Sequence, residues 1–170
     1  EGFFKRCLQG FGSRTAAVDT VVSRIIQAGI KRIEGSVIGD DSYFIGNAVP
    51  GSWEYDDLQW YYGAEVSALP VNDNAIGLTV KPGPAGYPCA VTIDPAGILY
   101  RVENKCVTSP AGSPRTLTIK KAIDRNELVI SGDLPLGNAG FNGTVSVSRP
   151  AELFAFLVTQ QLQAKGIEVK

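Results

Sequence analysis

From residue 75 onward, the sequence is a series of short segments in which apolar and polar residues alternate. Alternation of this kind is typical of β-strands that bury one face. In segment 75–80 it places Ile76, Leu78 and Val80 on the same side. The other strand candidates are 89–94, 98–108, 116–123, 127–132 and 143–148. Clusters of Gly and Pro separate several of them, which predicts turns. We therefore expect an antiparallel, β-rich unit over residues 75–148.

The first part of the chain has a different pattern. Residues 15–29 place valine and isoleucine side chains on one stripe of a helix. Ser13 or Thr15 can cap the start of this helix, and Gly29 is well placed to end it. Segment 30–40 follows directly as a strand candidate. A helix that leads straight into a strand indicates a mixed α and β unit.

The end of the chain returns to helical spacing. Pro150 suits the first turn, Glu152 lies near the positive end of the helix dipole, and Gly166 can terminate the helix. The apolar face consists of Leu153, Phe154, Leu157, Val158 and Leu162. No other segment is an obvious partner for this face, so we expect the helix to pack on a region outside the chain. The class is α+β: a small α/β unit, a β-rich unit and a C-terminal helix.

Charge and composition exclude some functions. Lys and Arg number 16 against 17 acidic residues, so the net charge of −1 gives no electrostatic reason to expect nucleic acid as a partner. The densest basic group, Lys120, Lys121 and Arg125, is small and fits a solvated strand face. No apolar run reaches the ~18–20 residues that span a bilayer, and no signal peptide is recognisable. The chain starts at Glu1 and contains no methionine, so we expect a processed or excised piece of a longer protein.

Histidine is absent from the sequence. This excludes a Ser-His-Asp triad, a Cys-His dyad and imidazole ligands for a metal, and we expect no cofactor and no metal site. The three cysteines lack C-x-x-C spacing. Cys89 and Cys106 lie near two neighbouring strand candidates. They could form a disulfide in an oxidising compartment or remain two buried thiols, and the sequence does not decide between these.

Two pairs of adjacent carboxylates, Asp40/Asp41 and Asp56/Asp57, invite a different hypothesis. Glycoside hydrolases use two carboxyl groups, and metal sites use several. Adjacent residues on an extended segment, however, point to opposite faces. The alternative is that Asp40 or Asp41 binds backbone amides in a turn, and that Asp56 or Asp57 caps a short helix. We favour this structural role.

An aromatic run lies between the two halves of the chain, with Trp53, Tyr55, Trp60, Tyr61 and Tyr62 within ten residues. Such side chains combine a flat apolar face with a polar tip, which suits stacking on sugars. The alternative is that they fill the core of a small domain. The candidate substrate contacts are Trp53, Tyr55, Trp60 and Tyr61.

Three ordered blocks carry a family resemblance: 28–44 with its G-D-D-S-x-F motif, 53–88 with W-x-x-D-D-L, and 145–169. Together they resemble the class C low-molecular-mass penicillin-binding proteins, the bacterial D-alanyl-D-alanine carboxypeptidase/endopeptidases. In that family, a long insertion folded as two extra domains interrupts the catalytic domain after its S-x-x-K motif. The chain then returns by a helix before the S-x-N and K-T-G motifs.

The catalytic motifs of that family are missing here. No serine of the sequence has a lysine three residues later, and neither S-x-N nor K-T-G occurs. The resemblance therefore implies that residues 1–74 and 75–148 are two inserted, non-catalytic domains, with 149–170 as the helix that re-enters the catalytic domain. Later strands could complete the first domain. No catalytic residue can be assigned in this chain.

The resemblance implies a parent that remodels peptidoglycan in the bacterial periplasm or cell envelope. A serine would be acylated by a D-Ala-D-Ala terminus and released by water, without a metal or an organic cofactor. The parent's catalytic domain would be the main partner, and this chain alone would not be acylated. The alternative is a stand-alone envelope module that binds peptidoglycan or a protein partner.

Overall fold

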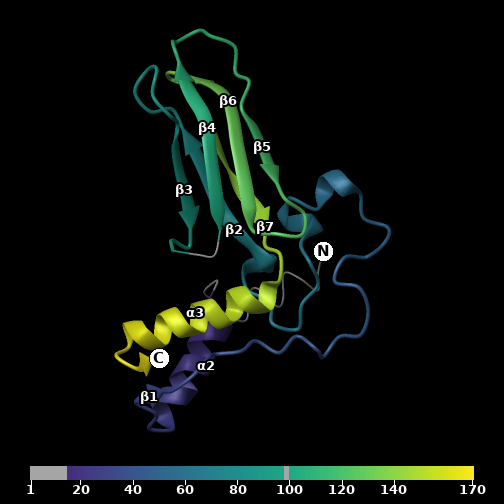
Figure 1. Cartoon of the computed structure of the whole chain (residues 1–170), viewed down its shortest axis with the longest axis vertical. Helices are drawn as coiled ribbons and strands as arrows, with labels where there is room; N and C mark the ends of the chain where they lie inside the picture. Colours follow the sequence, from purple (N-terminus) through teal and green to yellow (C-terminus); the bar gives the residue numbers. More distant parts are fainter. Residues whose placement is uncertain (1–14, 98–99) are drawn as a thin grey trace. The chain divides into compact units, whose positions relative to one another are not determined.

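The computed structural model describes residues 15–97 and 100–170 (Figure 1). These residues divide into two compact units. Of the described residues, the first unit contains 15–46, 67–72 and 149–170, and the second contains 47–66 and 73–148. The chain therefore passes between the units after residues 46, 66, 72 and 148.

The first unit is built on two helices and one short parallel strand pair. Helix α2 (Ala16–Gln27) begins after Thr15 and ends where Gly29 adopts a positive φ of 77°. The helix predicted over these residues is confirmed, although the Thr15 side chain binds Asp19 and makes no capping bond to the backbone. Ser13, the other cap candidate, lies outside the described residues. Strand β1 (Arg32–Ile33) pairs with β8 (Glu168–Val169).

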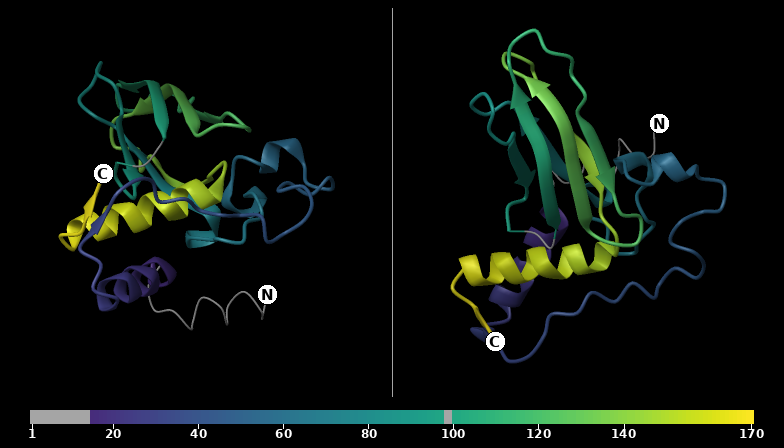
Figure 2. Two further views of the ribbon diagram at one scale, coloured as in Figure 1. Left: turned by 60° about the horizontal axis from the view of Figure 1, so that its bottom comes forward. Right: turned by 45° about the horizontal axis from the view of Figure 1, so that its top comes forward.

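The C-terminal helix α3 (Pro150–Ala164) has the predicted boundaries, with Pro150 in its first turn and Gly166 at a φ of 82° after its end. Its buried face contacts α2, which lies beside it in Figure 2. The expectation that no other segment of the chain pairs with this helix was therefore wrong. Of the apolar stripe of α2, Val18 and Val22 are buried.

The second unit contains two three-stranded sheets, seen one in front of the other in Figure 1. One has the order β3-β2-β7 and the other β4-β6-β5. The strands are β2 (Ala75–Lys81), β3 (Ala90–Asp94), β4 (Arg101–Ser109), β5 (Thr118–Lys121), β6 (Glu127–Pro135) and β7 (Phe141–Ser146). Three short 3₁₀ turns precede β2: η1 (Tyr55–Asp57), η2 (Tyr61–Gly63) and η3 (Asn72–Asn74).

The core of this unit follows the alternation seen in the sequence. Ile76, Leu78 and Val80 of β2 are fully buried, as are Leu128 and Ile130 of β6. Each sheet thus contributes one apolar face, which is what period-two patterning predicts. The α+β class is confirmed.

One strand pair departs from the antiparallel pattern. Strand β4 pairs with β6 in parallel, from Arg101↔Glu127 to Ser109↔Pro135, while the other pairs of these sheets are antiparallel. The strand that follows β4 in sequence, β5, does not occupy the position beside β4 in the sheet. Strand β5 therefore forms the far edge, and β6 returns between β4 and β5. Alternation reports which face a strand buries and does not report the direction of its neighbour.

Candidate functional site

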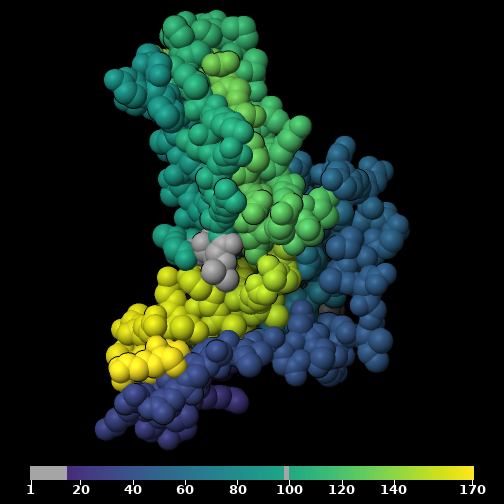
Figure 3. Space-filling view, in the orientation of Figure 1, coloured from purple at the N-terminus to yellow at the C-terminus, as the bar shows by residue number. Residues whose placement is uncertain are grey.

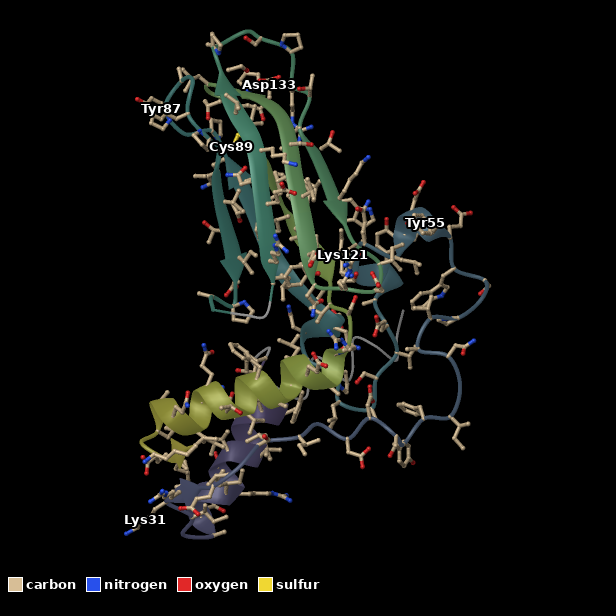
Figure 4. The ribbon with its side chains drawn as sticks, viewed as in Figure 1. Lys31, Tyr55, Tyr87, Cys89, Lys121 and Asp133 are labelled. Atoms are coloured by element: carbon tan, nitrogen blue, oxygen red, sulfur yellow. A yellow bond between two sulfur atoms is a disulfide. The ribbon has the colours of Figure 1, made fainter. Side chains whose placement is uncertain are left out.

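The aromatic segment contains the turns η1 and η2, which expose its tyrosines. Tyr55, Tyr61 and Tyr62 are 73%, 53% and 55% exposed, whereas Trp53 and Trp60 are half-buried. The rings of Tyr61 and Tyr62 meet edge to face with centroids 5.3 Å apart. Tyr55 is labelled on η1 in Figure 4, and Figure 3 shows this part of the chain in blue. The structure thus presents the tyrosines to solvent and holds the tryptophans inward.

Strand β7 anchors this segment. Trp60 forms an isolated bridge with Val145, and its ring lies 6.0 Å from that of Phe141. The Ser146 hydroxyl donates to the carbonyl oxygen of Leu58 at 2.6 Å, and the Ser146 amide donates to the carbonyl of Gln59 at 3.0 Å. Trp60 therefore fixes the segment in place, which fits the core role left open by the sequence.

The link between the two turns depends on a close backbone approach. A Cβ atom at Gly63 would overlap the carbonyl oxygen of Asp57, so only glycine fits there. The Trp60 amide donates to the same Asp57 carbonyl at 2.9 Å, and the Gly63 amide donates to the carbonyl of Trp60 at 3.0 Å. These contacts link η1 to η2 through the backbone.

The charge of the segment is of one sign. Residues 47–66 contain four carboxylates and neither Lys nor Arg. Within the described parts of the chain, Glu54, Asp56 and Asp57 form no ion pair with a cation. Partial burial, followed by the charge and a hydrogen bond of the nearby Asp57 carboxylate, raises the pKa of Tyr62.

The role expected for Asp56 and Asp57 as helix caps is wrong. The residue that precedes η1 is Glu54, and no side chain makes a capping bond there. Asp56 and Asp57 lie inside the turn itself, because the turn starts at Tyr55, whereas a cap at either aspartate requires a turn that starts after it. Their carboxylates are left to face solvent and Tyr62.

The first carboxylate pair has the turn role that we favoured. Asp40 Oδ1 accepts the Ser42 amide at 2.9 Å, and hydrogen bonds from Ser42 lower the pKa of Asp40. Asp41 Oδ1 accepts the amide of Ala68, which lies 27 residues further along the chain but within the same unit. The two carboxylates thus bind two different backbone groups. Over residues 15–97 and 100–170, no group of three or more His, Cys, Asp or Glu side chains could hold a metal ion.

A buried polar network that the sequence did not suggest lies in the second unit. The Lys121 Nζ donates to Ser148 Oγ at 2.8 Å and to the carbonyl of Ala122 at 2.9 Å, although Lys121 is only 8% exposed (Figure 4). Burial lowers the pKa of Lys121, and the charges of Glu65 and Asp124 oppose that shift. The expectation of a solvated face is therefore wrong for this residue.

A serine beside a lysine is the pairing that acylating enzymes use, but the access that acylation needs is missing here. Ser148 is 1% exposed and its hydroxyl donates to the carbonyl of Ile123 at 3.0 Å. Asn126 binds both the amide and the carbonyl of Ser148, at 2.8 Å and 3.0 Å. This network holds the chain at the end of the second unit, directly before Arg149.

Cys89 and Cys106 form a disulfide in the structure, with Cα atoms 5.4 Å apart. Cys106 belongs to β4 and Cys89 directly precedes β3, so the bond ties one sheet to the other. The Cys89 amide also donates to the Cys106 carbonyl at 2.9 Å. Cys7 lies outside the described residues. None of the described helices is long and apolar enough to cross a membrane.

Comparison with known proteins identifies a family and several relatives of this chain. The model of the D-Ala-D-Ala carboxypeptidase 3 (S13) family matches residues 12–170. A D-alanyl-D-alanine carboxypeptidase of Actinomadura sp. (strain R39) is 27% identical over 159 residues, which cover 90% of this chain and 30% of that protein. A penicillin-sensitive carboxypeptidase A of Dictyostelium discoideum is 22% identical, with 96% of this chain and 34% of that protein covered. The chain thus spans about a third of the length of these curated relatives.

Solved structures share the fold. The crystal structure of penicillin binding protein 4 from Haemophilus influenzae superposes with a TM-score of 0.74 and 19% identity, covering 92% of this chain and 35% of that one. The structure of that protein complexed with a novel β-lactam gives a TM-score of 0.60 at 17% identity, over 92% of this chain and 33% of that one. The family model covers nearly the whole sequence, and the resemblance predicted from the motifs agrees with it. The chain therefore belongs to the D-Ala-D-Ala carboxypeptidase 3 (S13) family, among the low-molecular-mass class C penicillin-binding proteins.

Proposed function

We propose that this chain is the inserted, non-catalytic part of a serine D-alanyl-D-alanine carboxypeptidase/endopeptidase that remodels peptidoglycan. One observation carries the proposal: the family model matches residues 12–170, yet the sequence contains no S-x-x-K, S-x-N or K-T-G motif. Acyl transfer by a serine needs a base within hydrogen-bonding reach and an accessible hydroxyl. The one serine–lysine contact described, Ser148 with Lys121, is buried.

Residues 1–74 and 75–148 are proposed to be the two inserted domains of the family, with later strands completing the first. Residues 149–170 would lead back toward the parent's catalytic domain after packing on α2. The parent's serine would attack the D-Ala-D-Ala carbonyl and water would release the acyl group. This chain would contribute shape, access for substrate and contacts to partners.

The proposed location is the bacterial periplasm or cell envelope. A disulfide between Cys89 and Cys106 suits an oxidising compartment, because cytosolic thiols are kept reduced. Peptidoglycan is the polymer that a protein of this kind would meet there.

A fluorescent penicillin tests the proposal. We expect it to label the full-length parent covalently and to leave the 170-residue chain unlabelled. A parent variant without its S-x-x-K serine serves as the control and should also stay unlabelled. Covalent labelling of the isolated chain would refute the proposal. If that label were lost in Ser148→Ala, Ser148 would be the acylated residue.

The second candidate function is a stand-alone envelope module that binds peptidoglycan. The exposure of Tyr55 and Tyr61 supports it, because exposed tyrosine rings can stack on sugars. The sequence flanking this segment in its gene separates the two. S-x-x-K upstream with S-x-N and K-T-G downstream would exclude a stand-alone module, and their absence would exclude the inserted segment.

A further inference from the structure

We propose that η1 and η2 carry a docking surface for a cationic peptide, one whose lysine ammonium groups lie over tyrosine rings. We call this the acidic tyrosine surface, and it consists of Glu54, Tyr55, Asp56, Asp57, Tyr61 and Tyr62. The inference goes beyond the proposed function, since it assigns a ligand class to a surface outside the acylation chemistry.

Ring geometry is the first support. Tyr55, Tyr61 and Tyr62 all expose more than half of their surface, and a ring interplanar angle of 84° turns the faces of Tyr61 and Tyr62 in different directions. A cation placed over a ring face is attracted by the ring quadrupole. Large exposed aromatic groups that gather in one place mark interaction sites more often than isolated ones do.

Unpaired charge is the second support. Some exposed carboxylates elsewhere in the chain pair with cations: Glu103 with Lys105 at 2.8 Å, and Glu152 with Arg149 at 3.1 Å. Among the described residues, Glu54, Asp56 and Asp57 have no such partner, and residues 47–66 contain no Lys or Arg to supply one. A surface that carries charge of one sign attracts ligands that carry charge of the opposite sign.

Rigidity is the third support. Ser146 binds the backbone of Leu58 and Gln59, and Trp60 packs on Phe141, so strand β7 holds the surface in place before any ligand arrives. A surface that is already ordered loses little conformational entropy on binding.

A cation fits this surface better than a neutral sugar does. A sugar would use the ring faces but would gain only ordinary hydrogen bonds from the carboxylates. An ammonium group uses the ring face and the full charge together. The observations therefore favour a lysine-bearing peptide over a glycan strand.

The test uses the 170-residue chain and a fluorescent Gly/Ser peptide that contains several lysines. We expect saturable binding that weakens as salt rises, because surface charge interactions are screened. Tyr61→Leu and Tyr62→Leu keep apolar area but remove the ring, and each should weaken binding about two- to fivefold. Asp56→Asn should weaken binding and reduce its dependence on salt.

Matched controls distinguish binding at the acidic tyrosine surface from nonspecific binding. Tyr87 lies in the same unit and is 63% exposed, and its loop, residues 82–88, contains no carboxylate, so Tyr87→Leu should leave binding unchanged. The same peptide with every lysine acetylated should not bind. Three results would overturn the proposal: equal binding of the acetylated peptide, an equal loss in Tyr87→Leu, or no binding at millimolar peptide. Tyrosine-dependent binding of an N-acetylglucosamine oligomer instead of the peptide would assign the surface to glycans and equally refute it.

Discussion

The ammonium nitrogen of Lys121 lies 2.8 Å from the hydroxyl oxygen of Ser148, at a point of the β-rich unit where both residues are almost completely buried. The contact joins the end of β5 to the segment that follows β7. Because Asn126 also holds the backbone of Ser148, the chain is fixed on three sides just before it enters α3. We infer a structural role for a pair whose residue types would suit catalysis.

The first prediction concerns the cost of breaking this contact. Ser148→Ala leaves the buried ammonium with one partner fewer, and we expect the free energy of unfolding to fall by about 1.5–3 kcal/mol. Urea denaturation measures it. Ser131→Ala, on β6 of the same unit, is the control and should stay within about 0.5 kcal/mol of the parent chain.

Coupling between the two residues gives a sharper readout. In the Lys121→Met variant there is no buried ammonium group to lose a partner. Ser148→Ala should therefore lower the free energy of unfolding clearly less in that variant than in the parent chain. Strict additivity of the two substitutions would contradict the proposed contact.

The second prediction is a pH dependence. Burial lowers the pKa of Lys121 below 10.5 in the folded chain. Between that lowered pKa and about 10.5 the unfolded chain binds more protons than the folded one, so the free energy of unfolding contributed by Lys121 rises with pH across this window. At lower pH both states are protonated and the contribution is constant and unfavourable.

Lys121→Met should therefore lose this rise, while Lys120→Met, one residue earlier on the opposite strand face, should keep it. The two variants must be compared with each other, because burial and the nearby Glu65 charge raise the pKa of Tyr100 and give an opposite slope at alkaline pH. Tyr100 is present in both variants, so its contribution cancels. Identical pH profiles for the two variants would rule out a desolvated Lys121.

Lys120 and Lys121 also illustrate what the sequence could and could not predict. Apolar and polar residues alternate in segment 116–123. Lys121 lies on the same strand face as Leu117 and Ile119, so the alternation predicts that its side chain points inward. Lysine rarely fills such a position, and charge alone suggested a solvated face. The partner that makes burial tolerable, Ser148, lies 27 residues away and no local pattern indicates it.

The same limit applies to the aromatic segment and to the sheets. Composition located the run 53–62, yet only the contact of Trp60 with Phe141 and Val145 decides which rings face inward. Helices α2 and α3 followed from periodicity because their signals are local. The parallel pairing of β4 with β6 could not be predicted from local patterns, because it depends on the position of β5 at the edge of the sheet.

The third prediction concerns the disulfide. Under non-reducing conditions, mass spectrometry of a tryptic digest should find the peptides of Cys89 and Cys106 linked. Since the two cysteines are separated by 17 positions in the sequence, Cys89→Ser together with Cys106→Ser should lower the free energy of unfolding by about 2–4 kcal/mol. Two free thiols at these positions in protein purified without reductant would contradict the bond.

The fourth prediction separates a structural from a catalytic role for the adjacent aspartates. Asp41 ties its own loop to the backbone of Ala68, so Asp41→Ala should lower the free energy of unfolding by about 1–2 kcal/mol. Hydrogen exchange at the Ala68 amide should accelerate in this variant, since the amide loses its acceptor. Asp40→Ala removes only the hydrogen bonds from Ser42, two residues away, and should cost less and leave the Ala68 amide protected. If Asp41→Ala instead kept full stability and abolished a hydrolytic activity of the chain, the carboxylate pair would belong to an active site and its structural assignment would fall.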